Sequence, residues 1–155
     1  MERTAHTVAL LVGSNPLPNY IAAVALQARH VVLFYSSETE IPCTHLKTAL
    51  EKRTTKVSRV VIRDATDVRA IRDAWRTVSV SVDHVHYSGG TKPMAAHIRA
   101  ACRLGEAQAS YLDERKRVLR FAARRVRARA HVRLPPYPAR DSTAGEYHTP
   151  DGWSV

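Results

Sequence analysis

Short apolar segments alternate along this chain with segments of helical periodicity, and this alternation most constrains the fold. Patterns typical of strands cover residues 6–12, 31–35, 57–62, 82–87 and 107–112. Apolar residues recur at helical spacing in residues 20–29, 44–53, 68–78 and 94–104, with Thr44 a candidate N-cap of the second helix. Strands and helices in this order predict an α/β fold, a Rossmann-like and mostly parallel sheet with helices on both faces.

The pattern changes after residue 113. Residues 114–116 predict a hairpin turn into a strand at residues 117–122, which gives the fold a C-terminal antiparallel hairpin. Residues 124–134 alternate Arg with Val, Ala or His, and they fit a further strand or a helix, because Ala and Arg favour helices. We expect one domain at residues 1–135 and a C-terminal tail at residues 136–155.

A chain of 155 residues is long enough for one domain with a core, and its net charge of +10 indicates a polyanionic partner or an acidic surface. A solvated, arginine-rich surface is the alternative explanation of the charge. The basic residues crowd one stretch, comprising Arg115, Lys116, Arg117, Arg120, Arg124, Arg125, Arg127, Arg129 and Arg133.

The sequence contains neither an apolar run long enough to span a membrane nor a signal-peptide pattern, so we expect no membrane association and a cytoplasmic location. Cys43 and Cys102 lack metal or redox spacing and are expected to be buried thiols. His84 and His86 share one strand face, where partly exposed strand residues are favoured over a metal pair. Prolines replace the glycines of a dinucleotide turn at residues 13–18. We therefore expect no metal and no cofactor.

Residues 88–94, Ser-Gly-Gly-Thr-Lys-Pro-Met, link the strand at residues 82–87 to the helix that follows. Pro93 suits the first turn of that helix. Bare backbone N–H groups beside a positive helix end favour an anion such as phosphate, and Lys92 adds a full charge. The spacing differs from the Walker pattern, and a plain strand-to-helix turn is the alternative.

Small polar side chains follow the other strands at the same edge of the predicted sheet, where open α/β sheets bind ligands. Any one of them could serve a cap or a turn, but their shared location favours a binding site. These residues are Ser14, Asn15 and Asn19; Ser36, Ser37, Glu38 and Thr39; and Asp64, Thr66 and Asp67.

Three segments resemble the CARF (CRISPR-associated Rossmann fold) domains found at the N-terminus of type III CRISPR ancillary effectors. They are residues 11–19 (Leu-Val-Gly-Ser-Asn-Pro-Leu-Pro-Asn), 34–36 (Phe-Tyr-Ser) and 87–94 (Tyr-Ser-Gly-Gly-Thr-Lys-Pro-Met). Residues 111–113 (Tyr-Leu-Asp) also resemble that branch, and the resemblance runs from about residue 7 to about residue 135.

The resemblance implies a sensor domain of type III CRISPR antiviral signalling. Such a domain is a homodimer that binds a cyclic oligoadenylate, most often cyclic tetra-adenylate, across its two-fold axis. Ser14 and Asn15 would contact phosphate or ribose, residues 89–92 would cradle phosphate, and residues 36–39 and 64–66 would line adenine pockets. The full set of implied ligand-binding residues is Gly13, Ser14, Asn15, Pro16, Asn19, Ser36, Ser37, Glu38, Thr39, Asp64, Thr66, Ser88, Gly89, Gly90, Thr91, Lys92, Pro93 and Met94.

Two other functions stay open. Some such domains cleave their own ligand without a metal, and a ring nuclease of this kind would use Ser14 and Lys92. A basic nucleic-acid-binding domain would instead use the arginines of residues 115–133. The sequence shows no nuclease or deaminase pattern. The resemblance thus implies a CARF-like ligand-binding domain at residues 1–135, with a tail or a truncated linker to an effector domain at residues 136–155; the effector would be fused or be a separate protein.

Overall fold

The computed structural model describes residues 4–104, 107–122 and 131–133. The elements follow one another as β1 (Thr7–Leu11), α1 (Leu17–Ala25), β2 (His30–Tyr35), the 3₁₀ turn η1 (Ser37–Thr39), α2 (Glu40–Glu51), β3 (Lys56–Val61), α3 (Val68–Arg76), β4 (His84–His86), α4 (Lys92–Leu104), β5 (Gln108–Asp113), β6 (Val118–Ala122) and β7 (His131–Arg133).

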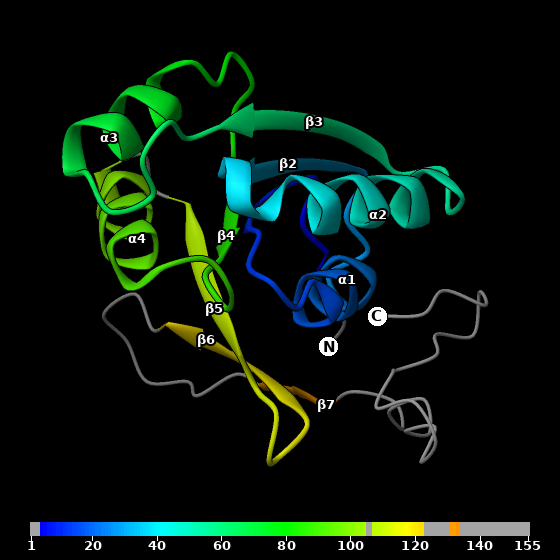
Figure 1. Ribbon diagram of the computed structural model, residues 1–155. Helices are drawn as coiled ribbons and strands as arrows, with labels where there is room; N and C mark the ends of the chain where they lie inside the picture. The colour runs from blue at the N-terminus through cyan, green and yellow to red at the C-terminus, as the bar shows by residue number, and fades with distance from the viewer. Residues whose placement is uncertain (1–3, 105–106, 123–130, 134–155) are drawn as a thin grey trace.

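The strands form one sheet in the order β3-β2-β1-β4-β5-β6-β7 (Figure 1). Strands β1 to β5 pair in parallel, whereas β6 pairs antiparallel with β5 and β7 antiparallel with β6. This confirms the predicted α/β fold with an antiparallel hairpin. The chain leaves β1 towards β2 and β3 and later returns to β4 on the other side of β1. The β1–β4 boundary is therefore the point where the winding direction reverses.

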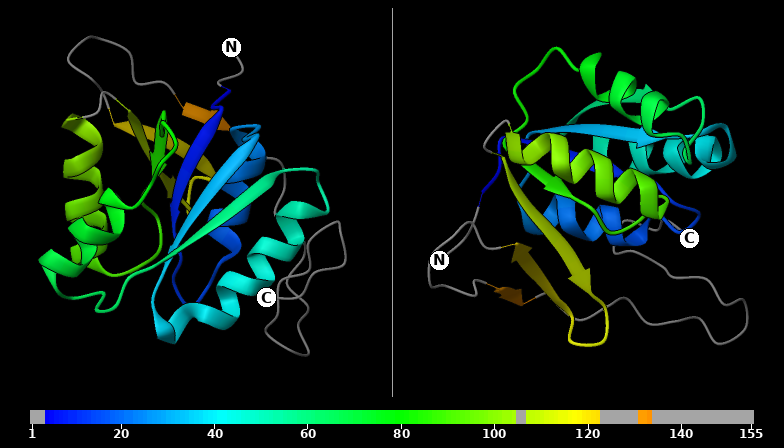
Figure 2. Two further views of the ribbon diagram at one scale, coloured as in Figure 1. Left: turned by 90° about the horizontal axis from the view of Figure 1, so that it is seen from above. Right: turned by 90° about the vertical axis from the view of Figure 1, so that its left-hand side faces the viewer.

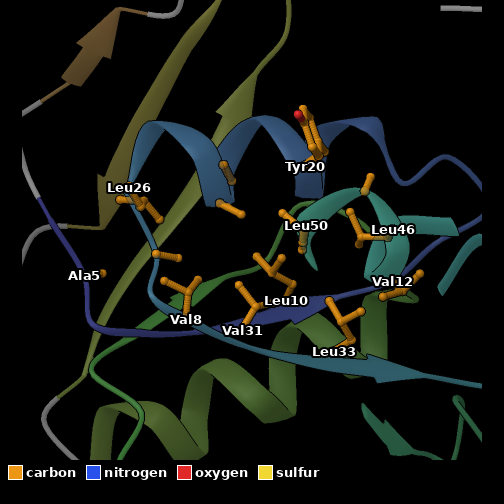
Figure 3. Close-up of a cluster of buried hydrophobic side chains, with 14 of the residues drawn as sticks. Ala5, Val8, Leu10, Val12, Tyr20, Leu26, Val31, Leu33, Leu46 and Leu50 are labelled. Atoms are coloured by element: carbon orange, nitrogen blue, oxygen red, sulfur yellow. The ribbon is translucent and has the colours of Figure 1, made fainter. Parts of the chain in front are cut away.

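Helices cover both faces of the sheet (Figures 1 and 2). Helices α1 and α2 pack with Leu10, Val31 and Leu33 in one apolar cluster, which Figure 3 shows. Helices α3 and α4 pack with Val32 and Phe34 on the opposite face. Because successive residues of β2 enter different clusters, the strand reads as a continuous apolar run.

Helix α4 begins at Lys92, two residues before its predicted start, and two other helices begin three or more residues early. Helix α1 begins at Leu17, three residues before the predicted start, because Pro18 lies in the first turn, where its missing N–H is not needed. Helix α2 begins at Glu40, and Thr44 lies within it and donates its hydroxyl to the Glu40 carbonyl at 3.0 Å. The prediction of Thr44 as N-cap is therefore wrong.

The histidines of β4 are buried, whereas the sequence predicted partly exposed residues. His84 and His86 are 2% and 0% exposed, and both rings contact the Ser110 hydroxyl, at 2.7 and 3.1 Å. The hairpin covers this face, since Phe121 of β6 packs edge-on against His84. Burial lowers the pKa of His86 to about 3, so the ring is neutral. Cys43 and Cys102 are buried free thiols, as predicted.

The C-terminal predictions fall only partly on described residues. The turn at residues 114–117 and strand β6 lie close to their predicted positions, and β7 favours a strand over a helix at residues 131–133. Residues 123–130 and the proposed tail at residues 136–155 lie outside the described residues, so the domain boundary stays a prediction. No helix within the described ranges is long and apolar enough to cross a membrane.

Candidate functional site

The site lies at the carboxyl edge of the parallel strands, where the β1–α1 loop (residues 12–16) meets the β4–α4 loop (residues 87–91). The two loops flank the point where the winding direction reverses. Their backbones touch, because a Cβ atom added to Gly13 would lie 3.0 Å from the Gly90 nitrogen. The structure therefore brings together the two segments that the sequence singled out most strongly.

Packing against β1 explains why the β4–α4 loop contains two glycines. Gly89 has φ of +103°, and a Cβ atom there would lie 2.5 Å from the Leu11 carbonyl oxygen. Gly90 has φ of +65°, and its Cβ atom would lie 3.1 Å from side-chain atoms of Leu11 and Met94. Both positions thus require glycine for structural reasons, whether or not a ligand binds.

The same loop presents hydrogen-bond donors at the start of α4. Among the described residues, no acceptor bonds the backbone N–H of Gly89 or Gly90. Lys92 is exposed and is the first residue of α4, a helix of 13 residues. Donors, a lysine and the positive end of a helix dipole together suit a phosphate group.

The β1–α1 loop adds side-chain donors beside them. Ser14 and Asn15 are exposed, whereas Pro16 is buried and precedes α1. The Asn15 side-chain oxygen accepts the Leu17 N–H at 3.1 Å, which leaves the Asn15 amide nitrogen to donate outward. Ser14 and Asn15 can therefore reach a ligand, and Pro16 shapes the loop.

Asn19, a predicted ligand contact, is buried, and its side chain is 0% exposed. Its amide nitrogen donates to the carbonyl oxygens of Leu11, at 2.9 Å, and Ser88, at 3.3 Å. The residue lies at the site but beneath its surface.

Ser88 and Thr91 tie the β4–α4 loop to its neighbours. The Ser88 hydroxyl oxygen accepts the Leu112 N–H at 2.6 Å, and its own proton is still available to a ligand. The Thr91 hydroxyl donates to the Ala65 carbonyl and accepts the Met94 N–H, so Thr91 caps α4.

The start of α4 is shaped by two further predicted site residues. Pro93 lies in the first turn of the helix, as predicted. Met94 is 1% exposed, which places its side chain in the core beneath Gly90. Neither side chain is presented to solvent as Lys92 is.

The loop after β2 presents two exposed side chains, those of Ser37 and Glu38. Ser36 and Thr39 cap the 3₁₀ turn, with the Ser36 N–H donating to the Thr39 hydroxyl at 3.0 Å. Ser36 is 8% exposed, while Ser37 and Glu38 are exposed. Only Ser37 and Glu38 of this loop have freely presented side chains.

The loop after β3 (residues 62–67) lies beside the β4–α4 loop through the Thr91–Ala65 bond. Asp64 accepts both the N–H and the hydroxyl of Thr66, at 2.8 and 2.6 Å, and these bonds lower the pKa of Asp64. An ionised carboxylate suits a base amino group or a ribose hydroxyl better than a phosphate. Asp67 instead caps α3, accepting the N–H groups of Arg69 and Ala70.

Sequence reasoning missed a cationic and aromatic group next to the site. The Arg99 guanidinium lies 5.0 Å from the ring centre of Tyr87, whose ring lies 5.7 Å from that of Tyr111. Tyr111 is 38% exposed, and burial raises the pKa of Tyr87. Arg99 follows Lys92 by seven residues, and this spacing, which places both on one face of α4, was the available signal.

The described residues contain no group of three His, Cys, Asp or Glu side chains that could hold a metal ion. The donors at the site are amides, hydroxyls and one ammonium group. Their chemistry suits a polyanion rather than a cation.

No protein-family model and no curated protein matches this chain. Solved structures do share its fold. Can2 from Sulfobacillus thermosulfidooxidans, solved in complex with cyclic tetra-adenylate, is 19% identical with a TM-score of 0.64, and the match covers 84% of this chain and 37% of that one.

Two other structures are similar in the same way. Protein VC1899 from Vibrio cholerae is 12% identical with a TM-score of 0.73, over 83% of this chain and 36% of its own. A type III CRISPR defence DNA nuclease activated by cyclic oligoadenylate is 23% identical with a TM-score of 0.62, and the match covers 78% of this chain and 21% of the nuclease. This chain thus spans little more than a third of the first two proteins and about a fifth of the third, and at these identities the comparisons establish a shared Rossmann-like α/β fold.

Proposed function

We propose that this chain is a CARF-like sensor domain that binds a cyclic oligoadenylate in type III CRISPR antiviral signalling. The observation that carries the proposal is the contact between the β1–α1 and β4–α4 loops at the β1–β4 boundary. Beside it lie Lys92 and the N–H groups of Gly89 and Gly90, which no acceptor in the described part of the chain bonds. Of the similar structures named above, Can2 was solved in complex with cyclic tetra-adenylate, and the DNA nuclease is activated by cyclic oligoadenylate.

The proposal assigns phosphate recognition to the two central loops. Ser14 and Asn15 donate from one side, and the Gly89 and Gly90 amides with Lys92 donate from the other. Charge-assisted bonds of this kind are stronger than bonds between neutral groups. A ring of four nucleotides carries four phosphates. A homodimer would place two such sites around the ring, so that its donors neutralise the phosphate charge and its two-fold symmetry matches that of the ring.

The outer loops suit the bases and sugars. Ser37, Glu38 and Asp64 present side chains that accept hydrogen bonds, and the adenine amino group and the ribose hydroxyls donate them. Residues 36–39 and 64–66 are therefore proposed to line the adenine pockets. Cyclic tetra-adenylate is the first ring to test, and the effector that responds to it is a fused domain or a separate protein of the cytoplasm.

Calorimetry with cyclic tri-, tetra- and hexa-adenylate tests the proposal directly. We expect one ring to bind preferentially, with one ring per two chains. Lys92→Ala should weaken that binding by at least about tenfold, because it removes a charged donor. Lys52→Ala is the matched control, since Lys52 is exposed and lies at the C-terminal end of α2, near the amino ends of the strands and away from the site. The proposal fails when no ring produces heat with the wild-type chain, or when both lysine variants bind alike.

Chromatography of the same mixtures separates a receptor from a ring nuclease. In the nuclease, a ribose 2′-hydroxyl attacks the adjacent phosphorus and expels the 5′-oxygen, which leaves a linear product with a 2′,3′-cyclic phosphate. Intact rings after long incubation identify a receptor. Linear products that disappear in Ser14→Ala or Lys92→Ala identify the enzyme.

A further inference from the structure

We infer that Asn19 is a positioning residue, which fixes the distance between the two phosphate-binding loops without touching the ligand. The inference rests on the proposed function for its effect on binding. Its structural part concerns the apo protein alone, and can be tested there.

Asn19 lies in the first turn of α1, directly beneath the junction of the loops. The pairing of β1 with β4 ends at Leu10 and His86, so the following residues are not held together by the sheet. The Asn19 amide nitrogen bridges this gap, donating to the Leu11 carbonyl at 2.9 Å and the Ser88 carbonyl at 3.3 Å. One nitrogen thus joins the end of β1 to the start of the β4–α4 loop.

The geometry requires a primary amide. Both acceptors are carbonyl oxygens, and a side-chain NH₂ group supplies two donors from a single atom. A carboxylate in the same place would face two carbonyl oxygens with no proton to share. The Asn19 side-chain oxygen is buried without a partner among the described residues, and it lies 3.2 Å from where a Gly89 Cβ atom would be.

The side chain therefore forms its hydrogen bonds through the amide nitrogen, which contacts both loops. The bridge continues outward through Ser88, whose hydroxyl accepts the Leu112 N–H of β5. The β4–α4 loop is consequently held from α1 on one side and from β5 on the other. A ligand that contacts Ser14 and Lys92 together depends on this spacing.

Two variants test the inference by calorimetry with the ring that the wild-type chain prefers. Asn19→Leu removes both donors at similar volume, and Asn19→Ser is milder because it keeps one short donor. We expect the affinity to fall roughly 10- to 100-fold in Asn19→Leu, and less in Asn19→Ser. The substitution keeps every residue that is proposed to contact the ligand, but it removes the bond that sets the distance between the two loops. Leu50→Ala is the control, since it opens the core at the end of α2 without touching either loop.

Hydrogen exchange of the ligand-free proteins distinguishes positioning from a general loss of stability. We expect faster exchange at residues 12–15 and 87–91 together in the Asn19 variants, and no such paired change in Leu50→Ala. Unchanged exchange at those loops overturns the inference, as does wild-type affinity in Asn19→Leu or an equal loss of affinity in Leu50→Ala. When the wild-type chain binds no ring, the proposed function fails, and the exchange result alone decides the role of Asn19.

Discussion

At the scale of single residues, several polar side chains near the site are committed to the protein rather than presented to a ligand. Thr91 bonds the Ala65 carbonyl, and Asn19 bonds the Leu11 and Ser88 carbonyls. Such bonds compete with ligand contacts for the same donors. Lys92, Ser14 and Asn15 are exposed, and we expect substitutions there to change affinity more than stability.

His86 offers a prediction about pH. Its ring is buried against Ser110 and near His84, and its pKa in the folded protein is about 3 against 6.5 for the free side chain. Below pH 6.5 the unfolded chain therefore binds a proton that the folded chain does not. This group alone should lower the free energy of unfolding by about 1.4 kcal/mol per pH unit as the pH drops from 6 towards 4, and its effect should disappear above about pH 7.5, where the unfolded side chain is also neutral.

Urea unfolding at pH 7, 6, 5 and 4.5 measures that slope. His86→Gln should flatten it by about one proton equivalent, because glutamine can still bond Ser110 but does not titrate. His45→Gln, on the exposed face of α2, is the matched control substitution. Equal slopes in His86→Gln and the wild-type chain would contradict the assignment.

At the scale of elements, the sequence predicted most of the sheet because each buried strand carries its own apolar signal. Helix starts were harder. The starts of α1 and α2 were misplaced, because prolines at residues 16 and 18 and the capping pair Ser36–Thr39 act over only a few residues. The burial of His84 could not be read locally, since it depends on Phe121 in a hairpin far along the chain.

The candidate site shows the same division between local and long-range information. Glycine and lysine in residues 88–92 were visible as a local pattern, and the switch in winding brought residues 12–16 beside them. The sequence does not predict the hydrogen bond from Asn19 to the Ser88 carbonyl, because the two residues are 69 positions apart. Sequence thus located the loops, and the structure sorted their residues into exposed and buried ones.

Helix α3 allows a prediction at this scale. Asp67 accepts the N–H groups of Arg69 and Ala70, both at 3.2 Å, whereas Asp73 only forms an exposed ion pair with Arg76. Asp67→Ala should lower the free energy of unfolding by about 1 kcal/mol, the usual value of an N-cap. Asp73→Ala removes the same charge from the same helix and should change it by less than about 0.5 kcal/mol. Chemical denaturation measures both, and equal losses would contradict the capping role.

At the scale of the whole molecule, the net charge of +10 has two candidate uses. In the first, Lys92 binds the phosphates of a cyclic oligoadenylate. In the second, arginines spread over the surface bind a nucleic acid. Of the basic stretch at residues 115–133, Arg120 is already paired with Asp113 at 2.9 Å. The excess charge as a whole therefore does not decide between a ring sensor and a nucleic-acid-binding domain, but the response of binding to salt does.

The number of phosphates that a protein neutralises sets the salt dependence of its affinity. If binding uses one Lys92 from each of two subunits, raising salt from 50 to 200 mM should weaken ring binding only about tenfold, whereas a duplex gripped by many arginines should lose about a thousandfold or more. Calorimetry with the ring, with linear tetra-adenylate and with duplexes of increasing length measures this. We expect the ring to bind more tightly than the linear molecule, since both carry similar charge but only the ring has the matching symmetry. Affinity that rises with duplex length and collapses with salt, with no preference for a ring, would instead identify a nucleic-acid-binding domain.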